Sequence, residues 1–249
     1  MPGLRLDCAK GQQGKAAMTV QGRQVLAGDP QIDIVLRRSA RARRMSLTVS
    51  GLDGRVTLTL PKRVALREGM AFVREKEAWL RGQLDRRPDP AVPAAGSGIE
   101  VSGRARLIVT AECRRARLLE DRIEVPRGAS VPAQVASCLK AEARARLTEA
   151  STRHAAILGR PFGRITLRDT RSRWGSCSSQ GDLMYSWRLI LAPAAVLDYV
   201  AAHEVAHLER MDHSPAFWAV VARLMPDHAA PRDWLRRNGA ELHRWSFTA

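Results

Sequence analysis

One short stretch of the chain carries the residues best suited to metal chemistry. His203, Glu204 and His207 form the pattern His-Glu-x-x-His, and His213 follows six residues later. Residues four apart on a helix lie on the same face, so the imidazoles of His203 and His207 can bind one Zn²⁺ ion. Glu204 then lies beside the ion without binding it, where it can accept a proton from a zinc-bound water. The pattern predicts one zinc per chain, with Glu204 as general base.

Chance and core packing explain the histidine pattern less well than a metal site does. The motif can arise by accident, or the histidines can be satisfied inside a core. Three of the six histidines crowd around one glutamate, and this crowding favours a metal site. Two nearby residues compete as ligands. Glu209 faces roughly 200° round the helix from His207, and a lone cysteine such as Cys177 is more often a small buried apolar residue.

The flanking residues predict two helices, with His213 in the turn between them. Pro193 suits a first helical turn, and no Gly or Pro interrupts the residues from Val196 to Leu208. Ser214 and Pro215 are typical of the cap and first turn of a second helix. His213 therefore lies outside both helices, free to turn back toward the metal.

The rest of the chain predicts an α+β fold in three parts. Residues 1–30 are predicted to be a mobile tail, residues 31–126 a β-rich lobe, and residues 127–249 the catalytic domain. Alternating apolar residues predict strands in the lobe, at Ile32–Leu36, Met45–Val49, Val56–Leu60, Leu107–Val109 and Ile123–Val125. The other expected elements are a turn at residues 51–54, helices at Arg67–Leu84, Ser130–Leu158 and Pro231–Trp245, a connection at Arg87–Gly98, and strands at Ile165–Arg168 and Leu183–Leu191.

Charge and composition restrict the possible partners. The formal net charge is +16, and the basic residues cluster only at Arg37–Arg44, which leaves nucleic acid as a possible partner. No apolar run is long enough for a signal peptide or a membrane span, so no membrane partner is predicted and the expected location is the cytoplasm. The four cysteines are scattered without a Cys-x-x-Cys pair, which fits a reducing compartment.

Four segments together resemble one family. They are Arg171–Ser178 (Arg-Ser-Arg-Trp-Gly-Ser-Cys-Ser), Ser186–Pro193, Leu197–His207 and Asp212–Trp218, and the pattern is similar to that of the YgjP-like metallopeptidases, relatives of the SprT-like and WLM metalloproteases. The resemblance implies a zincin fold with His203, His207 and His213 as zinc ligands. Arg210 stands where metzincins have glycine. Ser186 and Cys138-Leu139 depart from the Asn and the aromatic pair that are usual in the family.

The predicted reaction is hydrolysis of a peptide bond in a peptide or protein substrate. Trp174, Tyr185, Arg188 and Tyr199 are candidate substrate-contacting residues, and the donor to the oxyanion is sought among Tyr199, Tyr185, Arg188 and His228. An extended peptide is expected to add as a strand at the sheet edge formed by residues 171–188.

Three rival functions remain open. They are a nucleic-acid-tethered protease acting on bound proteins, a zinc-held binding module without turnover, and hydrolysis of a non-peptidic amide. Glu204 argues against the binding module, because a purely structural zinc site needs no base.

Overall fold

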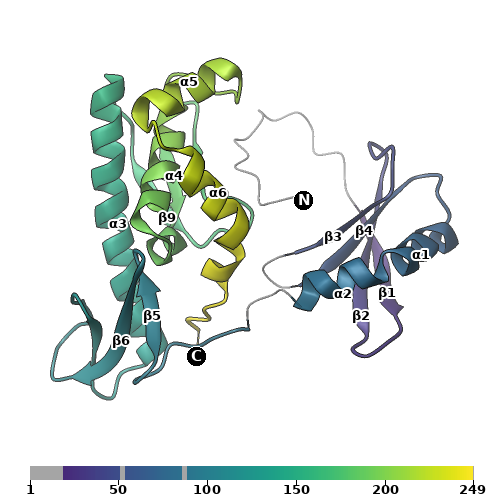
Figure 1. Cartoon of the computed structure of the whole chain (residues 1–249), viewed down its shortest axis with the longest axis horizontal. Helices are drawn as coiled ribbons and strands as arrows, with labels where there is room; N and C mark the ends of the chain where they lie inside the picture. Colours follow the sequence, from purple (N-terminus) through teal and green to yellow (C-terminus); the bar gives the residue numbers. More distant parts are fainter. Residues whose placement is uncertain (1–18, 51–53, 86–88, 249) are drawn as a thin grey trace. The chain divides into compact units, whose positions relative to one another are not determined.

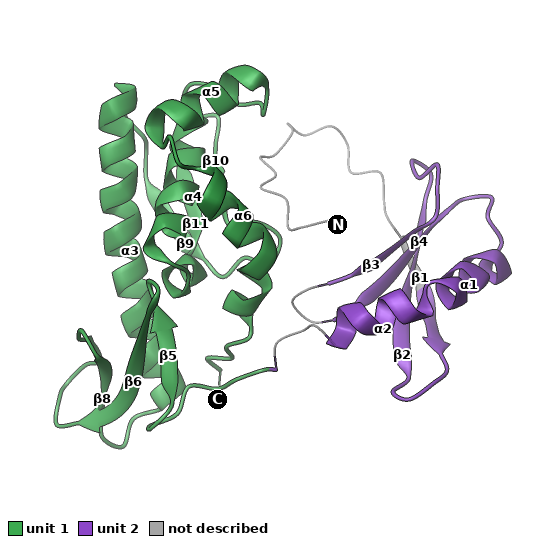
Figure 2. Ribbon diagram, in the orientation of Figure 1, with its two compact units in different colours: residues 1–9, 90–249 green, residues 10–89 purple. Residues whose placement is uncertain are grey.

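A computed structural model of the chain describes residues 19–50, 54–85 and 89–248, and these fall into two compact units (Figure 2). The smaller unit ends at Asp89, and the larger unit begins at Pro90. The boundary predicted at residue 126 is therefore wrong. The reason is packing: apolar side chains from residues 99–125 share one core with the following long helix, including Ile99, Ile108 and Ile123 with Val135 and Leu139.

The smaller unit is a four-stranded sheet carrying two helices. Its strands lie in the order β1-β2-β4-β3, with β2 and β4 parallel and the other neighbours antiparallel. The elements are β1 (Thr19–Leu26), β2 (Ile32–Ser39), β3 (Ser46–Val49), β4 (Val56–Pro61), α1 (Leu66–Glu75) and α2 (Glu77–Asp85). The alternating apolar residues of β2 and β4 are buried beneath the helices, as the period-two pattern predicts.

Two predictions for this unit are wrong in part. Residues 19–26 belong to the predicted tail but form β1, which pairs antiparallel with β2. The single predicted helix Arg67–Leu84 is two helices, because Lys76 leaves helical geometry at φ −97° and ψ 12°. Of the predicted turn at 51–54, residues 51–53 lie outside the described part of the chain. Strands β3 and β4, which the turn was predicted to connect, do pair antiparallel.

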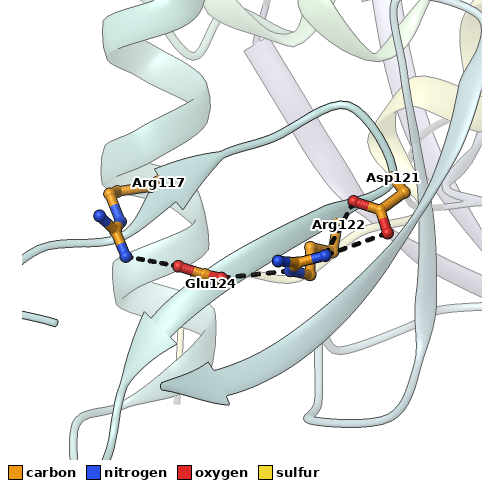
Figure 3. A network of polar contacts seen from close by, with 4 residues as sticks. All are labelled: Arg117, Asp121, Arg122 and Glu124. Atoms are coloured by element: carbon orange, nitrogen blue, oxygen red, sulfur yellow. Dashed lines mark hydrogen bonds and ion pairs between the residues drawn. The ribbon is translucent and has the colours of Figure 1, made fainter. Parts of the chain in front are cut away.

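The larger unit opens with a second four-stranded sheet, in the order β5-β6-β8-β7. Its strands are β5 (Gly98–Val101), β6 (Arg104–Ala111), β7 (Arg117–Leu118) and β8 (Arg122–Pro126). Glu124 of β8 accepts hydrogen bonds from Arg117 and Arg122, at 2.6 and 3.1 Å, and Asp121 bonds Arg122 in turn (Figure 3). These bonds hold the pKa of Glu124 below its usual range. The ion pairs therefore link the short edge strand β7 to its neighbour.

The long helix α3 (Val131–Leu158) runs alongside the later elements of the larger unit (Figure 1). It ends where predicted, because Gly159 adopts the left-handed conformation at φ 70° that commonly closes a helix. A three-stranded sheet follows, in the order β10-β11-β9, with β10 antiparallel and β9 parallel to β11. Its strands are β9 (Ile165–Arg168), β10 (Gly175–Cys177) and β11 (Leu183–Ser186).

The segment after β11 leads directly to the helices that carry the motif. The predicted strand Leu183–Leu191 is a strand only to Ser186, and the 3₁₀ helix η1 (Trp187–Leu191) continues it. The remaining elements are α4 (Ala194–Ala206), α5 (Pro215–Leu224), α6 (Ala229–Asn238) and η2 (Gly239–His243). The α+β class is confirmed. Within the described residues, no helix is both long and apolar enough to cross a membrane.

Candidate metal centre

Helix α4 positions the His-Glu-x-x-His motif in the interior of the larger unit. It packs against α3, α5 and α6, and lies between α3 and α6 in Figure 1. His203, Glu204 and His207 are each at most 2% exposed. His207 caps the C-terminal end of α4, and Ser214 caps the start of α5, where its hydroxyl accepts a hydrogen bond from the backbone N–H of Phe217. His213 therefore lies in the turn between two helices, as predicted.

The three histidines converge on one point. Their candidate ligand nitrogens all lie within 4.8 Å of one another, and the Nε2 atoms of His203 and His213 are 3.1 Å apart. Two nitrogens each about 2.0–2.1 Å from a tetrahedral zinc ion are separated by about 3.3 Å. The donor set thus fits a metal ion of this size and coordination.

Hydrogen bonding leaves a ring nitrogen of His207 directed at the same point. Its Nδ1 lies 2.9 Å from the carbonyl oxygen of Arg210, which can only accept, so Nδ1 carries the proton. The Nε2 of His207 is buried and has no hydrogen-bond partner in the described structure, as a ligand atom awaiting a metal requires. A histidine ligand commonly donates its other N–H in this way, which fixes its tautomer and ring orientation.

Burial also favours the neutral imidazoles of His203 and His207, two of the candidate ligands. Burial and the neighbouring histidines hold the pKa of His203 well below its ordinary value. Burial lowers the pKa of His207 to about 4. Because only a neutral imidazole offers a lone pair, these shifts favour metal binding at neutral pH.

Phe217 of α5 fixes the rings in place. It is fully buried, and its ring centroid lies 4.9, 4.5 and 4.8 Å from those of His203, His207 and His213. Trp218, its neighbour, lies 5.7 Å from His203. The sequence places both aromatic residues on a helix but indicates no role for them in the site.

Glu204 is buried against the backbone of β10. A Cβ atom placed on Gly175 would lie 2.5 Å from Oε1 of Glu204, so only glycine leaves room for this carboxyl group. Burial raises the pKa of Glu204 to about 8, although the nearby charge of Arg173 acts in the opposite direction. A divalent cation beside the carboxyl would favour its charged form.

The four residues predicted to contact substrate are all buried. Trp174 is 1% exposed and stacks on His243, with 5.0 Å between centroids. Tyr185 shares a hydrogen bond of 3.0 Å with Ser151. Arg188 donates to both carboxylate oxygens of Asp169 and to the carbonyls of Leu242 and Trp245. Internal hydrogen bonds therefore account for Tyr185 and Arg188, whereas Trp174 is packed in the interior and its Nε1 has no partner in the described structure.

Tyr199 is a different case. It is fully buried one turn before His203, with ring centroids 6.0 Å apart, and its hydroxyl has no hydrogen-bond partner in the described structure. Burial raises the pKa of Tyr199, so the hydroxyl stays protonated and able to donate. His228, the remaining candidate donor, bonds the carbonyl of Met225 through Nδ1 and stacks on Trp218.

The two competing ligands lie outside the histidine cluster. Glu209 forms an ion pair of 2.9 Å with Arg223. Cys177 is a buried residue of β10, and its thiol contacts the carbonyl of Ser178.

Comparison with known proteins matches the chain to one family model. The model of the YgjP-like metallopeptidase domain matches residues 43–238. No curated protein matches the chain. Among solved structures, the chain is similar to the metallopeptidase zymogen abylysin of Pyrococcus abyssi. The identity is 22% and the TM-score 0.33, over 37% of this chain and 92% of that one.

Proposed function

Because the chain belongs to the YgjP-like metallopeptidase family, we propose that it is a zinc-dependent peptidase with Glu204 as its general base. One observation carries the proposal: the ring nitrogens of three histidines converge, and Glu204, next to His203 on α4, has a buried carboxyl group that is in no ion pair among the described residues. His203, His207 and His213 would hold the ion. A zinc ion held by these three neutral ligands would supply a Lewis acid that acidifies water and polarises a carbonyl.

Glu204 transfers the proton in the proposed reaction. Its carboxylate accepts a proton from the attacking water and returns it to the leaving amine. Gly175 and the burial of the carboxyl group hold Glu204 in one position and exclude bulk water from it. Tyr199 is the proposed donor to the oxyanion, because its ring lies near that of His203 and its buried hydroxyl lacks another partner.

The edge strand β10 is the proposed docking place for the peptide. β10 ends the three-stranded sheet, and Gly175 brings it against Glu204. A peptide that adds as a strand beside β10 would pass the proposed base while its backbone hydrogen bonds fix its register.

The substitution Glu204→Gln tests the proposal. Glutamine keeps the shape of the side chain but cannot accept the proton, so we expect cleavage of a denatured casein substrate to fall roughly 10²–10⁴-fold. Zinc content, measured by atomic absorption, should remain near one ion per chain. Equal cleavage by the variant and the wild type would exclude Glu204 as the base.

The nucleic-acid-tethered alternative rests on the basic cluster Arg37–Arg44. Arg38 donates to the carbonyls of Pro61, Lys62 and Val64, which gives that residue a structural role. Arg43 and Arg44 are exposed. Tethering stays a prediction, and DNA or RNA binding that weakens steeply with rising salt would support it.

A further inference from the structure

One arginine of α6 lies beside the metal centre and takes part in none of the functions described above. The guanidinium carbon of Arg232 lies 4.3 Å from the centroid of the Trp218 ring. The same ring lies 5.7 Å from the centroid of His203 and 6.2 Å from that of His213. A single aromatic side chain therefore separates this cation from two of the proposed ligands.

The charge of Arg232 is available to a ligand. Its side chain is exposed, and within the described residues no carboxylate lies within ion-pair distance of it. Asp233, its neighbour in the sequence, instead pairs with Arg236 at 3.3 Å. Stacking on Trp218 limits the freedom of the guanidinium group, so less entropy is lost when it binds an anion.

A second cation flanks the centre near its proposed base. Arg173 lies two residues before Gly175, whose backbone packs against the carboxyl group of Glu204. The carboxylate of Asp212, in the turn before His213, accepts a hydrogen bond of 2.8 Å from the hydroxyl of Ser214, just before α5.

We propose that the metal centre selects peptides with a carboxylate close to the bond to be cleaved, and that Arg232 positions this carboxylate. The inference rests on the proposed peptidase function and adds a substrate class to it. The planar guanidinium group can bind both oxygens of a carboxylate at once. The net charge of +16 further favours the approach of acidic segments. The carboxylate belongs either to an Asp or Glu side chain or to the end of a peptide.

Binding to an inactive form separates recognition from catalysis. The full-length, zinc-loaded Glu204→Gln variant is titrated with short dansyl-labelled Ser/Ala peptides at physiological salt. Four peptides are compared: a neutral one with an amidated end, the same peptide with a central Asp, the same peptide with a free carboxyl end, and one with a central Lys. We expect the Asp or the free-end peptide to bind about fivefold more tightly than the neutral one, as for a partly exposed ion pair. Which of the two gains affinity identifies the source of the carboxylate.

Arginine variants locate the preference. Adding Arg232→Gln should abolish the fivefold difference, Arg232→Lys should retain part of it, and Arg232→Glu should favour the Lys peptide. Arg236→Gln, on the same helix and also exposed, is the matched control and should change nothing. Zinc content and the unfolding temperature show whether each variant is folded. Equal binding of all four peptides, or an equal loss in the Arg236→Gln control, would overturn the inference.

Cleavage assays distinguish failure of the proposed selectivity from failure of the proposed peptidase function. Cleavage that depends on Glu204 but is indifferent to acidic residues would refute the selectivity alone. Selective binding without any cleavage by the wild type would refute the peptidase function while leaving the recognition by Arg232 in place.

Discussion

The two units of the chain differ in how many polar side chains their interiors contain. In the described part of the smaller unit, the buried side chains are aliphatic, such as Ile34, Leu58 and Leu80. All eight buried polar or charged side chains of the described residues lie in the larger unit, and they are Arg106, Ser151, His154, Ser186, Arg188, His203, Glu204 and His207. Burying a polar group without a partner costs about 1–3 kcal/mol. The larger unit carries this cost at groups such as Nε2 of His207, where the proposed zinc ion would relieve it.

Within the larger unit, the buried polar residues again divide into two kinds. Arg188 and Ser151 have their partners within the protein. Others keep an atom without one, namely Oε2 of Glu204 and Nε2 of His207, but also Nδ1 of His154 and Oγ of Ser186. The convergence of three histidine nitrogens, more than an unpaired atom alone, therefore distinguishes the candidate metal centre.

Substitution of a proposed ligand histidine should have the largest effect, and the loss of stability should be confined to the larger unit. For His207→Ala we expect loss of the bound zinc and of all cleavage. A ligand present at 100 times its dissociation constant stabilises a fold by about 2.7 kcal/mol, so unfolding of the larger unit should move to lower temperature by a corresponding amount. Calorimetry with and without a chelator measures this shift. A shift in the smaller unit alone would contradict the contrast between the units.

Replacing one glycine by alanine in each unit should change the stability of the two units in opposite directions. Gly175→Ala places a methyl group 2.5 Å from Glu204, so we expect a loss of about 1–3 kcal/mol in stability together with reduced cleavage. Gly82→Ala in α2 meets nothing within 4 Å and should stabilise the smaller unit by about 0.5–1 kcal/mol. Denaturant unfolding measures both changes. Full activity in Gly175→Ala would show that the close packing of Glu204 is dispensable.

A further expected effect, about as small as that of Gly82→Ala, concerns acid stability. Burial would raise the pKa of Asp198, but bonds from His154 at 2.9 Å and from Arg153 hold it below its usual range. Because the folded-state pKa is the lower one, the stabilisation is present above about pH 4 and is lost as the pH falls through the folded value. Asp198→Asn should therefore cost about 1 kcal/mol at pH 7 and progressively less at lower pH. Urea titrations at several pH values test this; a constant difference would exclude the charge as its cause.

The candidate site was largely predictable because its signals are local. The spacing of His203, Glu204 and His207 depends only on helix geometry, and Ser214-Pro215 marks the start of α5, which leaves His213 in the turn. The resemblance to the YgjP-like family is also confirmed. These features need no knowledge of distant contacts.

The unpredicted features depend on contacts between distant segments. Among the β1 side chains that the structure describes, residues 22–26, only Leu26 is buried, and the strand is held by backbone pairing with β2. Strands β5–β8 join the larger unit because α3 covers them, which the order of elements does not reveal. Similarly, Tyr185 and Arg188 have the chemistry of substrate ligands, but their partners Ser151 and Asp169 lie 34 and 19 residues away along the sequence.

The position of β10 at the end of its sheet also bears on the solubility of the protein. An edge strand is a template for pairing with another chain, and proteins limit this hazard with short edges and charged flanks. β10 has three residues, and Arg171 and Arg173 precede it. A second copy of the chain would bring the same arginines to the same edge, where like charges repel. The strand that the proposed reaction leaves open to a peptide is thus protected from self-association.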